Sequence, residues 1–516
     1  MEIKSPAARL FTSPFFIPAL FGLLKLTLHL VANAFPAYEF FRDELYYLVS
    51  TDHLAAGYVD HPPLSIWILA LSRMLFGDSL FAVRLLPAVA GSAMVFITGM
   101  MVRELGGGRA AQAIACAASF LSLAGIASST FYSMNAWDMV FWSLAFLLLL
   151  KIARQPSLRL WTTLGVVLGL GLLNKTGVLW LGTGIGVGLM LMPRRIELRG
   201  RGPWIAAGIA FLLFLPYIIW NATHEWAHLE FIRNTSADKY GGLNPFDVLL
   251  GQVPVNNPAT LPLWLSGLVF FFLPSSRTWR IVGIVYLSVL FILIANGSSK
   301  PEYLAPALPV LFAGGAIALD RLRVRWLRVS LRTALVVLFV AGLGLFPIVL
   351  PVLSVKSYIA YAKAIGFEPK SMESQELGDL PQFYADMHGW RDLVKAVNVT
   401  YRMLPEDEQQ SCIIYAQNYG QASAITFLGD TLGLPRVVSG HNSYFLWGPG
   451  PNENPEAVIV VGGRKEDHEQ GFEEVELIMH YTSPHIMPYE NRKPIYVCRK
   501  LKKPLSELWP RVKHYM

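Results

Sequence analysis

The chain contains about eleven long apolar segments separated by short polar turns, and this pattern limits its fold more than any other feature. The segments fall at about 12–34, 80–102, 110–130, 136–153, 160–175, 177–192, 203–221, 259–274, 279–296, 302–319 and 331–353. With 53% hydrophobic and only 15% charged residues, the chain has too little polar surface for an ordinary soluble protein. About 20 apolar residues in a helix cross a bilayer core. We therefore predict a polytopic α-helical membrane protein.

Basic residues gather in alternate loops, which predicts how the chain is oriented in the membrane. The loops concerned contain Arg103 and Arg109; Lys151, Arg154 and Arg159; Arg194, Arg195, Arg199 and Arg201; Arg277 and Arg280; and Arg321, Arg323, Arg325, Arg328 and Arg332. Positive loops stay cytoplasmic, so we expect a cytoplasmic N-terminus, a retained first span and, in a bacterium, an inner-membrane location. The formal charge of +7 then reflects topology, and no nucleic-acid partner is expected.

The composition changes after about residue 354. Polar runs such as PEDEQQ appear, together with β-rich stretches at 412–416, 458–461 and 495–498 and a helix-like segment at 389–403. We predict a transmembrane domain over residues 1–353 and a small soluble α/β domain over 354–516, which an odd number of spans places in the periplasm. Cys116 lies in an apolar segment. Cys412 and Cys498 lie in the C-terminal domain. They could form a disulfide with each other or remain free thiols, and the sequence leaves both alternatives open.

Carboxylates concentrate on the predicted extracytoplasmic side. Residues 36–78 read as amphipathic helices lying in the membrane interface, and Asp43 and Glu44 follow the first span directly. Asp60 and His61, followed by two prolines, open the second interfacial helix, and Asp138 lies near the outer end of the fourth span. Ionisable groups at the edge of a span are costly to keep, so they indicate function.

Cations on the same side complete a set of groups that suits glycosyl transfer. Such transfer needs a carboxylate to orient or deprotonate an acceptor hydroxyl and cations to neutralise a departing phosphate. Lys175 and Lys300 would supply the positive charge. Structural alternatives stay open: the two acids at 43 and 44 would suit a helix cap, the segment 60–63 a helix start with an acid cap, and Lys175 would suit snorkelling at the interface.

The motifs FRDELYYLVSTDHLAAGYVDHPPLSIWILAL, LGLLNKTGVLWL and KPEYLAPALPVL, together with the segment carrying Asp138, resemble the GT-C superfamily of polytopic glycosyltransferases. The resemblance extends over about residues 10–330. It is greatest to the bacterial family 39/83 type, which is related to protein O-mannosyltransferases and to the aminoarabinose transferase that modifies lipid A. It implies a GT-C membrane fold and an enzyme that takes sugar from a polyprenyl-phosphate donor.

The resemblance also implies roles for individual residues. Asp43 matches the catalytic carboxylate, with Glu44 and Tyr47 beside it, and Asp138 matches a second important acid. In the relatives an acid followed by lysine binds a divalent metal and the donor phosphate; here the pair is Asp60 and His61, a shorter acid and a histidine. The donor-phosphate set implied or suggested by position is His61, Lys175, Lys300, Tyr303 and Tyr47, and the metal set is Asp60 and, more weakly, Glu44.

The leading hypothesis is an inverting glycosyltransferase that acts in one displacement on an acceptor glycolipid, glycan or protein. A transporter or flippase of lipid-linked sugars is the alternative from another class, although we see no inverted repeat. A non-catalytic membrane scaffold is the third. In the tail, aromatic residues such as Tyr415 and Trp447 would suit either sugar stacking or the core of a small domain.

Overall fold

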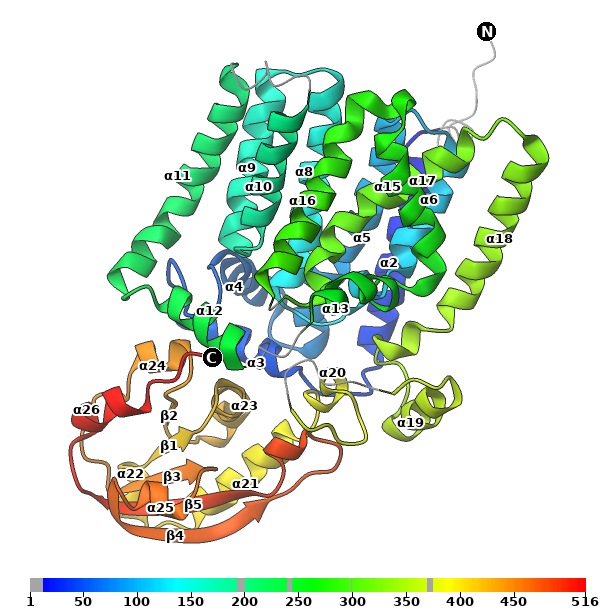
Figure 1. Ribbon diagram of the computed structural model, residues 1–516. Helices are drawn as coiled ribbons and strands as arrows, with labels where there is room; N and C mark the ends of the chain where they lie inside the picture. Colours follow the sequence, from blue (N-terminus) through cyan, green and yellow to red (C-terminus); the bar gives the residue numbers. More distant parts are fainter. Residues whose placement is uncertain (1–12, 193–199, 239–243, 298, 369–374) are drawn as a thin grey trace. The chain divides into compact units, whose positions relative to one another are not determined.

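The structure is a computed structural model that describes residues 13–192, 200–238, 244–297, 299–368 and 375–516. The loop arginines Arg194, Arg195 and Arg199 lie outside these ranges. The chain forms two compact units (Figure 1). The first comprises residues 1–35, 81–219 and 241–352, and the second comprises residues 36–80, 220–240 and 353–516. The second unit thus contains the first predicted loop as well as the C-terminal residues.

The first unit is a helical bundle. Its helices are α2 (Phe16–Ala34), α5 (Leu80–Glu104), α6 (Arg109–Leu121), α7 (Leu123–Ala127), α8 (Met134–Arg154), α9 (Leu158–Asn174), α10 (Val178–Leu191), α11 (Arg201–Thr223), α13 (Pro245–Leu250), α14 (Gln252–Val255), α15 (Leu261–Phe272), α16 (Arg280–Asn296), η4 (Pro301–Ala307), α17 (Leu308–Asp320) and α18 (Arg325–Leu343). Every predicted apolar segment contains one of them. Seven helical stretches of the described chain are long and apolar enough to cross a membrane, and shorter apolar helices occupy the other four segments. A multi-pass protein is confirmed, whereas the number eleven stays a prediction.

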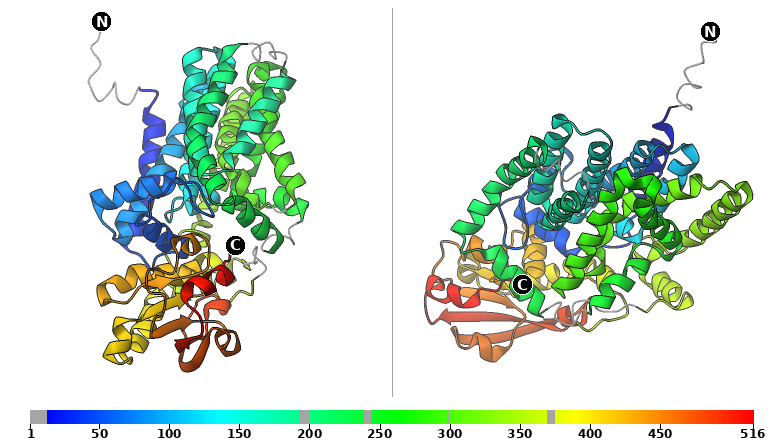
Figure 2. Two further views of the ribbon diagram at one scale, coloured as in Figure 1. Left: turned by 90° about the vertical axis from the view of Figure 1, so that its left-hand side faces the viewer. Right: turned by 45° about the horizontal axis from the view of Figure 1, so that its top comes forward.

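Close helix packing in this bundle depends on small residues. The helices run side by side in the two turned views of Figure 2, and α15 packs closely against α17. A Cβ atom at Gly267 would overlap the carbonyl of Leu311, and one at Gly315 would overlap the carbonyl of Leu263. Glycine at these positions lets the two backbones approach each other, which is a common way for membrane helices to associate.

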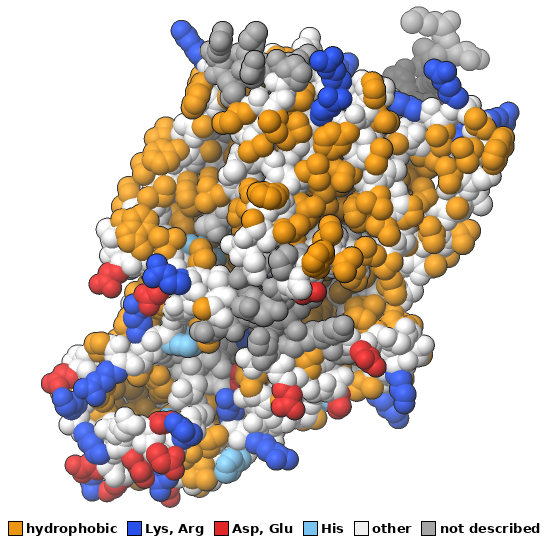
Figure 3. Space-filling model, in the orientation of Figure 1, with side chains coloured by type: hydrophobic (Ala, Val, Ile, Leu, Met, Phe, Trp, Pro, Cys, Tyr) orange, Lys and Arg blue, Asp and Glu red, His pale blue; other side chains and the backbone are white. Residues whose placement is uncertain are grey.

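The surfaces of the two units differ in chemistry. Figure 3 shows hydrophobic side chains over the exposed faces of the helices, and charged side chains gathered on the domain that carries the sheet. Exposed apolar residues of the bundle include Leu23, Leu212, Phe291 and Val340. Patches of this kind are rare on soluble monomers, so lipid is the solvent that suits the bundle.

The second unit begins with the two helices predicted for the first loop, α3 (Arg42–Ser50) and α4 (Leu64–Phe76). It continues with α12 (Ala227–Asp238), α19 (Val355–Ala364), α20 (Gln382–Ala385), α21 (Trp390–Arg402), α22 (Glu406–Gln410), α23 (Tyr419–Gly429), α24 (Ser443–Trp447), α25 (Lys465–His468) and α26 (Leu505–Leu508). Helix α21 confirms the helix predicted at 389–403. On α4, Met74 and Leu75 are exposed, as expected for a helix at a membrane surface.

A five-stranded sheet forms the centre of the C-terminal part. Its strands are β1 (Ile413–Ala416), β2 (Val437–Val438), β3 (Ala457–Val461), β4 (Phe472–Tyr481) and β5 (Lys493–Leu501), in the order β2-β1-β3-β5-β4. The first three are parallel, and β5 and β4 are antiparallel additions. The three predicted strands are present. The long strand β4 was missed because its acidic residues obscure the alternation of an edge strand.

The three cysteines are free and buried. Cys498 pairs with Val458 on β3, and Cys412 precedes β1 on the other side of β3. Because neighbouring strands lie about 4.8 Å apart, β1 and β5 are separated by two strand spacings. The disulfide left open by the sequence is therefore absent.

Candidate functional site

The side chain of Asp43 lies in the first turn of α3, where a tyrosine from the C-terminal domain holds it. Tyr419 at the start of α23 donates its hydroxyl proton to Asp43 Oδ1 at 2.9 Å. Burial raises the pKa of Tyr419 well above its ordinary value, so the hydroxyl keeps that proton. The Asp43 side chain is 35% exposed. An oriented carboxylate therefore remains open to another molecule.

Glu44 has a different task from its neighbour. Its Oε2 accepts a hydrogen bond of 2.9 Å from the backbone N–H of Phe41, which caps the N-terminus of α3. Glu44 is buried. The capping alternative is thus right for Glu44, whereas the carboxylate of Asp43 is bound by a side chain from another element.

Arg42 connects Asp43 to a buried carboxylate. Its Nη1 lies 3.5 Å from Asp386 Oδ2 and donates to the Tyr489 hydroxyl at 2.8 Å, and its Nε lies 3.6 Å from Asp43 Oδ1. The guanidinium also covers the Tyr419 ring, 5.4 Å from its centroid. A Cβ atom at position 420 would collide with this side chain, so Gly420 leaves the room it needs. A buried cation thus faces Asp43 and its tyrosine.

His388, close to this cluster, should make stability depend on pH. Burial, with a smaller effect of His485, lowers the pKa of His388 to about 4 from 6.5. The unfolded chain therefore takes up a proton before the folded chain does, so the contribution is complete above pH 6.5 and is lost as pH falls toward 4. We expect the thermal unfolding midpoint to fall over this range, and His388→Gln to flatten the dependence. The control His480→Gln, which changes an exposed histidine, should leave the pH dependence unchanged. If His388→Gln and wild type show the same pH dependence of the unfolding midpoint, His388 is not its source.

The motif that contains Asp60 and His61 is anchored by tyrosines. Tyr46 donates to Asp60 Oδ1 at 2.9 Å, and the Tyr47 ring stacks on His61 at 4.7 Å. His61 is buried, and its Nδ1 lies 3.0 Å from the carbonyl of Pro62. Helix α4 begins at Leu64 without a side-chain cap. The expectation that Asp60 caps this helix is wrong, because the tyrosine of α3 binds its carboxylate instead.

The described residues offer little to a metal ion. They contain no group of three or more His, Cys, Asp or Glu side chains that could hold one. Asp60 is a single carboxylate engaged by Tyr46, and Glu44 is used as a cap. A Mg²⁺ ion usually needs one or two carboxylates plus substrate phosphates and water. The described side chains therefore do not make a complete metal site by themselves.

A second cluster lies within the first unit and joins three predicted residues. Lys175 Nζ lies 3.6 Å from Asp138 Oδ2, donates to Asn135 Oδ1 at 2.7 Å, and lies 5.3 Å from the centroid of the Tyr303 ring. Asp138 is buried and the Lys175 side chain is 16% exposed. The snorkelling interpretation of Lys175 is wrong, because the ammonium group points to a carboxylate and an aromatic ring. Lys300 is half-buried and precedes η4, the segment that carries Tyr303.

Several residues of these clusters were missed by sequence reasoning. Arg42 and Tyr46 lie within the motif FRDELYYLVSTDHLAAGYVDHPPLSIWILAL. Arg42 could have been found from sequence, because it directly precedes Asp43. Asp386, Tyr419 and Ser443 are different, because they lie hundreds of positions away. Ser443 bonds Val59 through its hydroxyl at 3.1 Å and Tyr46 through its backbone at 3.3 Å. No local pattern marks such partners.

Comparison with known proteins agrees with this fold. The profile of the dolichyl-phosphate-mannose-protein mannosyltransferase family matches residues 60–220. The lipid A galacturonosyltransferase RgtD of Rhizobium johnstonii is 25% identical over 61% of this chain and 67% of the relative. The undecaprenyl phosphate-alpha-4-amino-4-deoxy-L-arabinose arabinosyl transferase of Pseudomonas aeruginosa is 30% identical over 53% of this chain and 52% of the relative. The chain thus spans about half to two thirds of the length of these relatives.

Solved structures extend the likeness to nearly the whole chain. ArnT from Cupriavidus metallidurans, in the apo state, matches with a TM-score of 0.60 at 14% identity and covers 93% of this chain and 97% of that one. The same protein bound to undecaprenyl phosphate gives a TM-score of 0.58 at 16% identity, with the same coverage. These matches show the fold that the motifs predicted. The chain therefore has an ArnT-like fold, and part of its sequence is similar to the dolichyl-phosphate-mannose-protein mannosyltransferase family.

Proposed function

We propose that this protein is an inverting glycosyltransferase that moves a sugar from a polyprenyl-phosphate donor to an acceptor at the extracytoplasmic membrane face. The observation that carries the proposal is the carboxylate of Asp43, which is partly exposed and held by Tyr419. The similarity to an undecaprenyl phosphate-alpha-4-amino-4-deoxy-L-arabinose arabinosyl transferase supports a lipid-linked donor. Acceptors of three kinds fit the proposal: a glycolipid such as lipid A, a polysaccharide or a protein.

In the proposed reaction, each residue has the role that the motifs predict for it. Asp43 takes the proton of the acceptor hydroxyl while the acceptor oxygen attacks the anomeric carbon of the donor sugar. The bond from that carbon to the phosphate oxygen breaks, and the lipid phosphate leaves with the bonding electrons. Lys175, oriented by Asp138 and Asn135, stabilises the negative charge on the departing phosphate. We assign Tyr303, Lys300, His61 and Tyr47 to donor-phosphate binding as well.

The proposal keeps the predicted membrane arrangement. The domain of residues 1–353 would carry the spans and the catalytic groups, its N-terminus cytoplasmic, and residues 354–516 would lie in the periplasm of a bacterium. Asp60 stays the candidate ligand of a divalent metal, and assays with EDTA, followed by restored Mg²⁺, test that part alone.

Mass spectrometry of cells lacking the gene tests the function. Envelope glycolipids, polysaccharides and glycoproteins would be compared before and after complementation with the wild-type chain. We expect one class of molecule to lose a sugar-sized mass in the mutant and to regain it with wild type, which also names the acceptor. An unchanged set of masses would reject glycosyl transfer and favour transport or scaffolding.

Lys175→Met should reduce transfer by roughly 10²-fold, because one preorganised positive group is lost from the departing phosphate. The change also leaves Asp138 buried without its cation, so stability falls too. The double variant Lys175→Met with Asp138→Asn separates the two effects: stability should return and activity should not. Lys151→Met, at the opposite end of α8 from Asp138, is the control. Recovery of activity in the double variant would remove Lys175 from the mechanism.

A further inference from the structure

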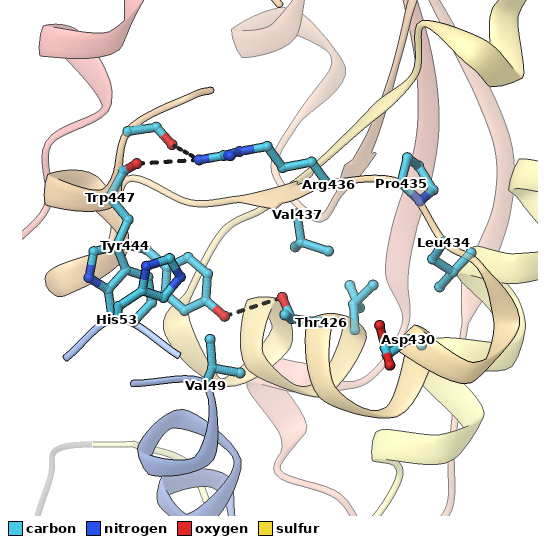
Figure 4. Close-up of a pocket in the computed structure, with 13 residues that line it drawn as sticks. Val49, His53, Thr426, Asp430, Leu434, Pro435, Arg436, Val437, Tyr444 and Trp447 are labelled. Carbon is cyan, nitrogen blue, oxygen red and sulfur yellow. Dashed lines mark hydrogen bonds between the residues drawn. The ribbon is translucent and has the colours of Figure 1, made fainter. Parts of the chain in front are cut away.

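A separate pocket of about 230 Å³ lies in the second unit, between the end of α3 and the C-terminal domain. Figure 4 shows Val49 from α3, His53 from the following loop and Thr426 from α23. It also shows Arg436 and Trp447, which belong to the segment 434–450, here called the tail motif. Ligand pockets for drug-sized molecules measure roughly 300–1,000 Å³. This smaller space suits a single sugar ring.

One side of the pocket is aromatic. The His53 ring stacks on Trp447 with centroids 4.2 Å apart and planes 12° apart, and Tyr444 lies 4.6 Å from Trp447. Burial lowers the pKa of His53, and the positive charge of Arg436 adds to this against the opposing effect of Asp52. A neutral, ring-lined wall of this kind offers contact to the apolar face of a pyranose.

The opposite side is polar. The hydroxyls of Thr426 and Tyr444 lie 3.3 Å apart, and Asp430 follows the end of the same helix α23 (Figure 4). Thr426 uses its proton for the carbonyl of Ala422 at 2.8 Å. Hydroxyl and carboxylate oxygens are the groups that bind sugar hydroxyls. The pocket therefore combines a stacking wall with hydrogen-bonding groups.

Arg436 adds a positive charge to the pocket. Its Nη2 donates to the carbonyls of Trp447 at 3.3 Å and of Gly448 at 3.4 Å, which fixes the guanidinium above the aromatic wall (Figure 4). Within the described part of the chain, Arg436 forms no ion pair. A guanidinium held in this way recognises phosphate or carboxylate groups well, because its planar fork matches their oxygens.

A row of aromatic contacts connects this pocket with Asp43. Tyr419 donates a hydrogen bond to Asp43, and the centroid of its ring lies 4.9 Å from the centroid of the Tyr46 ring. The Tyr46 ring in turn lies 6.2 Å from Trp447. All of these residues belong to the second unit. The pocket and the carboxylate are therefore connected by a partly buried row of aromatic contacts.

We infer that the pocket binds an acidic sugar residue of the acceptor glycan, one that carries a phosphate or carboxylate group. The ring would lie against the aromatic wall and the anionic group against Arg436. That this sugar belongs to the acceptor rests on the proposed transferase function, whereas the binding of an acidic sugar does not. The tail motif LPRVVSGHNSYFLWGPG then acts in selecting the acceptor rather than in packing alone.

Saturation-transfer NMR on the full-length protein in detergent tests the binding. The probes are N-acetylglucosamine 1-phosphate, N-acetylglucosamine and inorganic phosphate. We expect the sugar phosphate to bind at least about tenfold more tightly than either of the others, the value expected for a hydrogen bond to a charged group. Arg436→Gln should remove the preference for the sugar phosphate. Trp447→Ala should weaken the binding of both N-acetylglucosamine and its 1-phosphate. Arg492→Gln, which changes an exposed arginine elsewhere in the tail, is the control.

Three results of the binding experiment would contradict the pocket. Equal affinity for the neutral sugar, equal loss in the Arg492 control, or equally tight binding of inorganic phosphate would overturn the inference. Arg436→Lys, which keeps the charge, shows whether a loss in Arg436→Gln reflects misfolding. If transfer occurs, Arg436→Gln should raise the KM for the acceptor and leave kcat unchanged. Binding without transfer would reject the transferase alone, and transfer without binding would reject the pocket alone.

Discussion

Asp43→Asn is expected to lower the rate of sugar transfer by about 10²- to 10⁴-fold, the usual contribution of a general base. The asparagine amide oxygen still accepts the hydrogen bond from Tyr419, so the local fold should persist. It has no negative charge with which to take the acceptor proton. The measurement is the initial rate of transfer by purified wild-type and variant protein at equal donor and acceptor concentrations, together with their unfolding midpoints.

Asp407→Asn is the matched control for this prediction. Asp407 lies exposed in the first turn of α22, as Asp43 lies in the first turn of α3, and the change removes the same charge. Its rate should equal that of wild type. Full activity of Asp43→Asn would reject Asp43 as the base, and a loss of activity with a collapsed unfolding midpoint would point to folding instead.

Asp386→Ala should destabilise the second unit by about 3–5 kcal/mol, because it leaves the guanidinium of Arg42 buried without its main counter-charge. The Asp386 side chain is only 2% exposed and that of Arg42 15%. For a domain of this size the loss corresponds to a fall of roughly 6–20 °C in the unfolding midpoint. Thermal unfolding of the detergent-solubilised protein, followed by the near-ultraviolet signal of the tail aromatics, measures it.

Two further variants make this result specific. Asp467→Ala breaks an exposed pair with Arg464, and such pairs contribute little, so its midpoint should hardly move. Replacing both buried partners, Arg42→Met with Asp386→Leu, should recover much of the lost stability, since no uncompensated charge remains. A double variant as unstable as Asp386→Ala would show that packing, not charge, dominates at this site.

The membrane fold and part of the candidate site could be predicted from sequence, because they depend on local chemistry. Long apolar segments form helices wherever they are solvated by lipid, since each backbone group is satisfied within its own helix. Asp138, Lys175 and Tyr303 were named from motifs, and the bundle brings them together. In contrast, β4 was missed because an edge strand with acidic residues carries a weak alternation signal.

What the sequence by itself determined is therefore the class of the protein, its apolar segments and the motif residues at their polar ends. Only the tertiary structure decided which acid of the pair at 43 and 44 is a cap and which is presented by a tyrosine. Tyr419 lies 376 positions from Asp43 in the chain. A contact over that separation depends on how the tail folds against α3, and the packing of distant segments leaves no periodicity or spacing in the sequence from which it could be read.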